Sequence, residues 1–128
     1  MSIKSIYAMT GLSFVADTNF LINVHEGSSI TEPFLDANVV VSVISEIELL
    51  GYHALTQEDK VALHALLDDC LVVGLLPEIK EITIELKQQY KIKTPDAIIA
   101  ATSLYLRLPL VTSDKAFARL KNVELIII

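Results

Sequence analysis

The apolar residues of this chain fall into two patterns that follow one another along the sequence. Short continuous apolar runs, typical of strands buried on both faces, occupy 12–16, 39–41, 71–76, 110–112 and 123–128. Between several of them, apolar residues recur at intervals of three and four, as in Ile79, Ile82, Leu86 and Tyr90, which predicts amphipathic helices. Strands that alternate with helices predict an α/β fold with a mostly parallel sheet covered by helices on both faces.

Capping residues predict where several helices begin. Ser42 or Ser45 is expected to cap a helix that continues through Leu50, and segment 56–59 has the hydroxyl and acids of a helix N-terminus. The segment Thr94-Pro95-Asp96 predicts a further helix. Thr94 is expected to be its N-cap, with Pro at the favoured first position and an acid near the positive end of the helix dipole.

Composition limits the classes of protein to consider. The chain has 128 residues, of which 52% are hydrophobic and 20% charged, which favours a single domain over 1–128 and excludes a disordered or collagen-like chain. Cys70 is the single cysteine, so a disulfide scaffold is excluded and a reducing compartment, the cytoplasm, is expected. The formal charge of −6 argues against a partner held mainly by neutralisation of phosphates.

The sequence predicts no membrane association and no secretion. Its longest nearly apolar stretch is well short of the roughly 20 residues that span a bilayer. The first residues faintly resemble a signal peptide, but Thr10, Gly11 and Ser13 interrupt the apolar region. Residues 1–11 are therefore expected to be an N-terminal extension of the domain.

Several familiar chemistries have no support in the sequence. It has no glycine-rich loop followed by Lys, no Gly-x-Gly-x-x-Gly, no Cys pair and no Gly-x-Ser-x-Gly. His25, His53 and His64 are scattered, and we assign them no role. What remains is a set of acids near the ends of the predicted elements: Asp17, Glu46 or Glu48, Asp96 and Asp114.

These acids have a structural and a functional interpretation. Taken alone, Asp96 and Asp114 are explained as acids at helix N-termini, and Glu46 and Glu48 as a solvated helix face. Asp17 directly follows a strand that should be buried on both faces, where a charge needs a partner or a metal ion. Carboxylates are the ligands that Mg²⁺ or Mn²⁺ prefers, and ligands of open parallel sheets bind at the carboxyl ends of the strands. A metal site built from these acids is the functional hypothesis.

Four segments, in order, resemble the PIN-domain family, in particular the VapC-type toxins of bacterial toxin–antitoxin pairs. They are Asp17-Thr18-Asn19, Ile44 to Gly51, Thr94 to Thr102 and Val111-Thr112-Ser113-Asp114. The resemblance implies an α/β/α sandwich with a central mostly parallel sheet, in which acids bind Mg²⁺ or Mn²⁺ and RNA is cleaved endonucleolytically. By position, Asp17, Asp96 and Asp114 take the first, third and fourth acidic places of the family, and Asn19 and Thr112 take polar places that line or orient the cluster.

The second acid of the family pattern has two candidates in this chain. Residues 46 and 48 are about 200° apart around a helix, so only one can face the site. We favour Glu48, because the family glutamate usually precedes Leu-Leu and a nearby Gly, as Glu48 does. Many family members also have another acid just beyond the fourth, where this chain has Ala116.

The resemblance further implies a metal-dependent endoribonuclease that acts as the toxin of a type II toxin–antitoxin system. It implies a homodimer, inhibited by an antitoxin whose C-terminal segment blocks the acidic pocket. Lys80, Lys87, Lys91 and Lys93 are candidates for the RNA path, although a solvated helix face explains them as well. The apolar stripes 63–67 and 79–86 are candidates for the dimer or antitoxin surface, with burial in the protein's own core as the default.

Two other functions compete with this hypothesis. A haloacid-dehalogenase-like phosphatase also has an Asp after its first strand, but it normally needs a second Asp two residues later, where this chain has Asn19. A PIN-like interaction module without activity is favoured by the acidic pI of about 4.9 and by Ala116, while the four acids argue against it.

Overall fold

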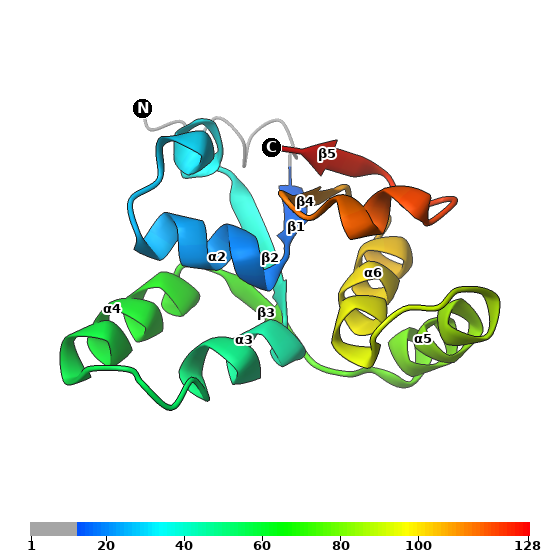
Figure 1. Cartoon of the computed structure of the whole chain (residues 1–128), viewed down its shortest axis with the longest axis horizontal. Coiled ribbons are helices and arrows are strands. Elements are labelled where there is room, and N and C mark those ends of the chain that lie inside the picture. The colour runs from blue at the N-terminus through cyan, green and yellow to red at the C-terminus, as the bar shows by residue number, and fades with distance from the viewer. Residues whose placement is uncertain (1–12) are drawn as a thin grey trace.

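The computed structural model describes residues 13–128 of the chain (Figure 1). The expected N-terminal extension, residues 1–11, and the predicted start of the first strand at Leu12 lie outside the described residues. In chain order the elements are β1 (Ser13–Ala16), α2 (Thr18–His25), the 3₁₀ helix η1 (Ser29–Phe34), β2 (Asn38–Ser42), α3 (Val43–Leu50), α4 (Gln57–Asp68), β3 (Leu71–Val73), α5 (Pro77–Gln89), α6 (Thr94–Leu106), β4 (Leu110–Thr112), the 3₁₀ helix η2 (Lys115–Arg119) and β5 (Leu125–Ile127).

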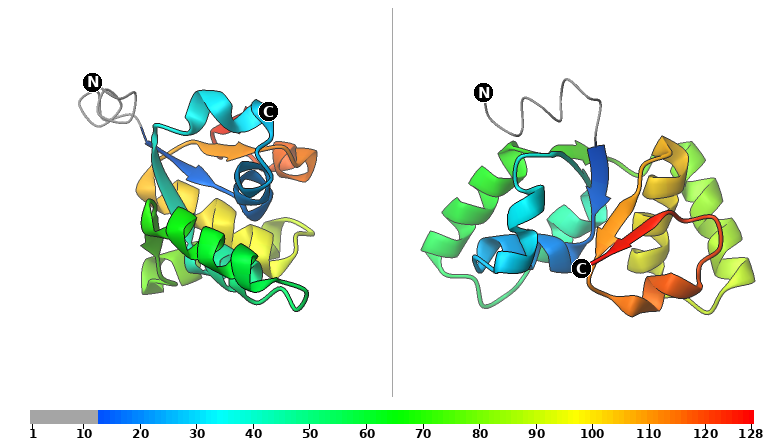
Figure 2. Two further views of the ribbon diagram at one scale, coloured as in Figure 1. Left: turned by 90° about the vertical axis from the view of Figure 1, so that its left-hand side faces the viewer. Right: turned by 90° about the horizontal axis from the view of Figure 1, so that it is seen from above.

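The five strands form one parallel sheet in the order β3-β2-β1-β4-β5. At its centre, Ala16 of β1 lies opposite Val41 of β2 on one side and Val111 of β4 on the other. Helices α2 and α4 cover one face and α5 and α6 the other, as the views in Figures 1 and 2 show. The predicted α/β class and the α/β/α sandwich are confirmed, and the sheet is parallel throughout.

Each strand contributes side chains to two separate hydrophobic layers. Phe14 and Ala16 of β1 pack on the α2 and α4 side, whereas Val15 between them packs on the α5 and α6 side. Side chains alternate between the two faces of a strand, so a continuous apolar run is what a sheet covered on both faces requires. The short strands therefore contribute side chains to both hydrophobic layers of the core.

The helix boundaries follow the predicted caps with one correction. The Ser42 side chain accepts from the Ile44 amide and caps α3, and Thr56 and Asp59 form a reciprocal capping box at α4. Thr94 was expected to be the N-cap of α6, but it lies inside the helix. Lys93 is the N-cap, because its carbonyl accepts the first helical hydrogen bond, from the Ala97 amide.

The two apolar helix stripes proposed as partner surfaces lie in the protein's own core. Leu63 and Leu67 of α4 belong to one buried layer, and Ile79 and Leu86 of α5 belong to the other. These stripes are therefore not free to form the dimer or antitoxin surface. Within residues 13–128, no helix has the length and apolar character needed to cross a lipid bilayer.

Candidate active site at the carboxyl edge of the sheet

The sheet extends from β1 in two opposite directions, so the boundary between β1 and β4 is a topological switch point. The chain moves from β1 outward to β2 and β3, and then returns to the other side of β1 with β4 and β5. The connections that leave β1 and β4 therefore separate at their carboxyl ends, and ligands of open parallel sheets bind at such points. Asp17 directly follows β1, and Asp114 follows β4 by two residues.

Asp17 is a buried acid held by two hydrogen bonds. Only 3% of its surface is exposed, although the residue carries a carboxylate. Its Oδ1 accepts from the Phe20 amide at 2.8 Å, which makes Asp17 the N-cap of α2. Its Oδ2 accepts from the Thr112 hydroxyl at 2.5 Å. Burial raises the pKa of Asp17; the two hydrogen bonds oppose this rise, and the charges of Asp114 and Asp96 add to it.

Thr112 links the two central strands at the site. Its hydroxyl oxygen accepts from the Asp114 amide at 2.9 Å, so the hydroxyl proton is directed to Asp17. The register explains the contact, because Ala16 and Val111 are paired and the next residues of the two strands are Asp17 and Thr112. Thr112 therefore fixes one oxygen of the buried carboxylate.

Removal of the Thr112 hydroxyl is expected to destabilise this edge of the sheet. In a Thr112→Val variant, Asp17 Oδ2 and the Asp114 amide both lose their partner, and an unsatisfied buried polar group costs about 1–3 kcal/mol. We expect urea denaturation to give a free energy of unfolding lower by that amount. Thr112→Ser keeps the hydroxyl and should retain most of the stability. An equal loss in both variants would show that the methyl group, and not the hydrogen bonds, carries the effect.

Asp96 and Asp114 line a shared cavity of about 220 Å³ near Asp17. Asp96 lies in the first turn of α6 and is half-buried. Burial raises the pKa of Asp96, and the charges of Asp114 and Glu48 raise it further, while Lys93 lowers it. Asp114 caps η2, since its Oδ1 accepts from the Ala116 amide at 2.8 Å. Both acids thus have the helix-terminal roles considered for them, and they also interact with each other and with Asp17.

Glu48, and not Glu46, is directed toward this group of acids. Glu48 Oε1 accepts from the hydroxyl of Thr18, the residue after Asp17, at 2.7 Å, and its charge acts on Asp96. The same Thr18 hydroxyl lies 3.0 Å from Ser45 Oγ, so α3 is tied to the start of α2. The geometry favours our choice of Glu48. Asn19, in contrast, is exposed in the first turn of α2.

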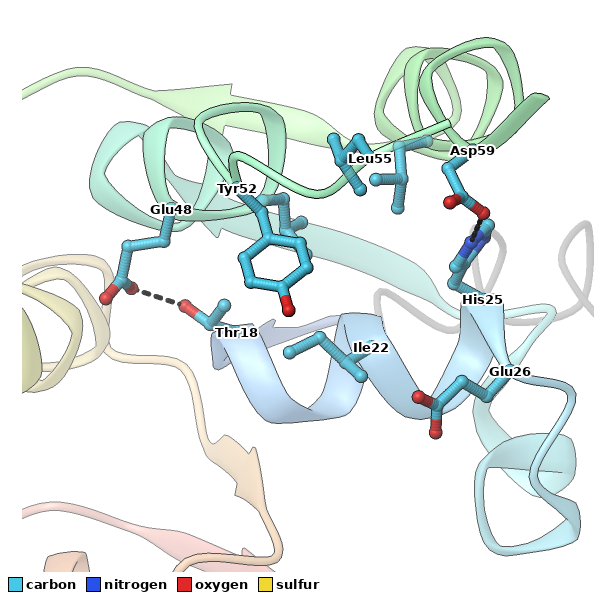
Figure 3. Close-up of a pocket in the computed structure, with 10 residues that line it drawn as sticks. Thr18, Ile22, His25, Glu26, Glu48, Tyr52, Leu55 and Asp59 are labelled. Atoms are coloured by element: carbon cyan, nitrogen blue, oxygen red, sulfur yellow. Dashed lines mark hydrogen bonds and ion pairs between the residues drawn. The ribbon is translucent and has the colours of Figure 1, made fainter. Parts of the chain in front are cut away.

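Glu48 also stands at one end of a larger cleft, of about 490 Å³, between α2, α3 and α4 (Figure 3). Ile22 and Tyr52 line its middle, and at its other end His25 Nε2 lies 3.0 Å from Asp59 Oδ1. This pairing ties α2 to the capping box of α4 and lowers the pKa of Asp59. No role for His25 followed from the sequence, because residues 34 positions apart give no local signal of a pairing.

The donor chemistry of the site fits a hard divalent cation. The four acids offer only oxygen ligands, and their charges raise the pKa of Asp17 and Asp96. Among residues 13–128 no three His, Cys, Asp or Glu side chains are already arranged to hold one ion between them. Mg²⁺ commonly binds through one or two carboxylates and keeps several waters, so such a site needs no cage of three protein ligands.

Sequence comparison assigns this arrangement to a family. The model of the PIN domain matches residues 14–123, which include all four acids of the site. The chain therefore belongs to the PIN-domain family of nucleases, of which the VapC type is the one that the sequence resembles. Comparison with the sequences of curated proteins finds no significant match.

Solved structures with the same fold come from bacterial toxin–antitoxin complexes. A toxin–antitoxin complex from Klebsiella pneumoniae is 30% identical to the chain, with a TM-score of 0.75, and the match covers 86% of this chain and 94% of the other. DNA-bound VapBC from Salmonella typhimurium has a TM-score of 0.77 at 19% identity, with 91% and 98% covered. VapBC2 from Rickettsia felis, bound to a DNA fragment from its promoter, has a TM-score of 0.74 at 18% identity, with the same coverage.

Proposed function

We propose that the protein is a metal-dependent endoribonuclease and the toxin of a type II toxin–antitoxin system. The observation that carries the proposal is the gathering of Asp17, Asp96 and Asp114, with Glu48 beside Asp96, at the β1/β4 switch point of a PIN domain. The domain is proposed to extend over residues 1–128, with 1–11 as an N-terminal extension, and to act in the cytoplasm on RNA.

The four acids are proposed to hold Mg²⁺ or Mn²⁺ next to a phosphodiester of the substrate. When bound, such an ion supplies a Lewis acid that polarises the phosphate and lowers the pKa of water at the site. The chain's own contribution is to fix the acids: Thr112 and the Phe20 amide orient Asp17, and Thr18 orients Glu48. Asn19, exposed beside Thr18, is proposed to contact the substrate side of the site.

A pair of glutamates on one helix tests the assignment of the second acid. We expect Glu48→Gln to lower the rate of Mg²⁺-dependent RNA cleavage at least about 100-fold, the effect of removing one preorganised charged group from a site of this kind. Glu46→Gln makes the same chemical change two residues away and should keep the activity. The measurement is cleavage of a labelled RNA with Mg²⁺ or Mn²⁺ and with excess EDTA.

Each other outcome of this assay has a clear meaning. If Glu46→Gln, and not Glu48→Gln, abolishes cleavage, the assignment of the second acid is reversed. Cleavage at full rate in excess EDTA would refute the metal mechanism. Hydrolysis of a small phosphomonoester, with RNA left intact, would favour a phosphatase, and a protein that binds RNA without cutting it would favour an inactive interaction module.

The partners are proposed to be a second copy of the chain and an antitoxin. The cleft between α2, α3 and α4 supports an antitoxin segment, because it is lined by the exposed side chains of Ile22 and Tyr52 and has Glu48 at one end. An Arg or Lys of the segment that reached Glu48 would gain charge-assisted hydrogen bonds. Light scattering on the isolated chain, and on the chain co-expressed with its antitoxin, measures both associations.

A further inference from the structure

Two segments far apart in the sequence carry most of the positive charge of this acidic chain. Residues 87–93 contain three lysines and residues 115–121 contain two lysines and one arginine, and neither segment contains an acid. Together they hold six of the ten Lys and Arg residues of a chain whose formal charge is −6. We call these six exposed side chains the cationic strip: Lys87, Lys91, Lys93, Lys115, Arg119 and Lys121.

The fold places the two segments side by side. The first forms the end of α5 and the loop to α6, and the second forms η2 and the residue pair that follows it (Figure 2). The Arg119 guanidinium donates to the Lys91 carbonyl, and the Lys121 amide donates to the Tyr90 hydroxyl at 3.2 Å. Lys87 Nζ folds back onto the loop and donates to the Ile92 carbonyl at 3.0 Å. The acceptors of these hydrogen bonds are backbone carbonyls and a phenol oxygen, and none of them is a carboxylate.

Among residues 13–128, the ion pair within 4.0 Å is His25–Asp59, between α2 and α4, on the opposite side of the sheet from α5 (Figure 1). No cation of the strip forms such a pair, although the charge of Lys93 acts on Asp96 and lowers its pKa. The strip borders the active site directly, because Lys91, Lys93 and Arg119 line the same 220 Å³ cavity as Asp96 and Asp114. Ala116 lines this cavity as well and adds no charge.

We propose that the cationic strip binds the phosphate backbone of the single-stranded nucleic acid that the site cuts. The proposal rests on the proposed nuclease function and assigns positioning residues for its substrate. A polyanionic strand laid along the strip leads into the cavity, where a phosphodiester meets the acids that hold the metal. Phosphates and protein carboxylates would both meet Asp96 and Asp114 at the end of the strip, but only a nucleic acid brings there the phosphodiester that the proposed nuclease cuts. The chain thus has a local basic surface although its formal net charge is −6.

The test is binding of a fluorescently labelled single-stranded RNA of 12 nucleotides, followed by anisotropy in excess EDTA so that cleavage does not interfere. The strip variant is Lys91→Gln and Arg119→Gln together. The control is Lys60→Gln and Arg107→Gln, which changes the net charge equally but lies on α4 and at the C-terminal end of α6. Kd is measured between 50 and 200 mM salt, with both proteins checked for folding by circular dichroism.

We expect the strip variant to bind at least 10-fold more weakly. The slope of log Kobs against log[salt] should become shallower by about 1.4, since the variant removes two cations and each phosphate contact to a single strand contributes about 0.7. The control should bind RNA like the wild type. Equal weakening of the two variants would overturn the proposal, because charge and not position would then decide binding. Binding of poly-glutamate with the same dependence on the strip would overturn it in favour of an acidic protein partner. If the strip binds RNA but the wild type cuts none with Mg²⁺, the nuclease function fails while the strip stands.

Discussion

We expect the Asp17→Asn variant to lose Mg²⁺-dependent RNA cleavage by at least about 100-fold while it keeps the native fold. The substitution preserves the shape of the side chain, and Asn caps helices about as well as Asp, so the bond from the Phe20 amide survives. What disappears is the charge that would hold the metal at the centre of the site. Asp68→Asn, at an exposed position on α4, makes the same chemical change away from the site and should cleave RNA like the wild type. Full activity of Asp17→Asn would remove Asp17 from the site.

The same variant should be more stable than the wild type when no metal is present. The pKa of Asp17 is raised, so the folded state binds its proton more tightly than the unfolded state does. The destabilisation by the charged carboxylate is thus complete above the folded pKa and disappears as the pH falls toward the ordinary value of 3.8. At pH 7 in EDTA we expect the variant to have a higher Tm than the wild type, and this gain should shrink as the pH is lowered. A gain that is independent of pH would contradict this explanation.

We expect Phe20→Ala to lower the free energy of unfolding by about 3–5 kcal/mol, a large share of the total for a small domain. The Phe20 side chain is 1% exposed, and its ring centroid lies 5.4 Å from that of Phe14 and 6.0 Å from that of Phe34, in edge-to-face arrangements. Truncation leaves a cavity directly beneath the first turn of α2. Urea denaturation measures the loss.

Phe20→Leu keeps much of the volume and should cost only about 1–1.5 kcal/mol. Because the Phe20 amide also binds Asp17, the cavity variant should lose catalytic activity even at temperatures where it stays folded. A loss below 1 kcal/mol in Phe20→Ala would show that the three rings are not tightly packed. Retention of full activity would show that Asp17 does not depend on this turn.

The sequence predicted the order of strands and helices well, because the signals for it are local. The apolar run before Asp17 predicts β1, the capping box at Thr56 predicts the start of α4, and the valines of 39–41 predict β2. Thr94 was misassigned by one residue, since a hydroxyl before Pro favours a cap, but the Lys93 carbonyl takes that role. The 3₁₀ helix η1 was not predicted, because its sequence around Pro33 has no helical period.

The site was less accessible to sequence reasoning, since its contacts join distant residues. The acids were recognised from their places at the ends of predicted elements, and the family resemblance added the preference for Glu48 and the place of Thr112. The structure adds the hydrogen bonds of Thr112 to Asp17 and Asp114. Lys80, Lys87, Lys91 and Lys93 were candidates for the RNA path, but Arg119 could not be joined to them without the fold. The same holds for the His25–Asp59 pair and for the stripes of α4 and α5, whose burial depends on what packs against them.

The hydrogen bond between Thr112 and Asp17, which spans 95 positions, sets an order of events during synthesis. A growing chain makes β1 well before β4, the neighbouring strand that completes the site. Until then β1 pairs on one side alone, and Asp17 has neither Thr112 nor Asp114 beside it. Contacts of such long range also form late in folding. If the protein cuts RNA as proposed, a nascent chain that lacks β4 has no assembled centre with which to cut the messenger that encodes it.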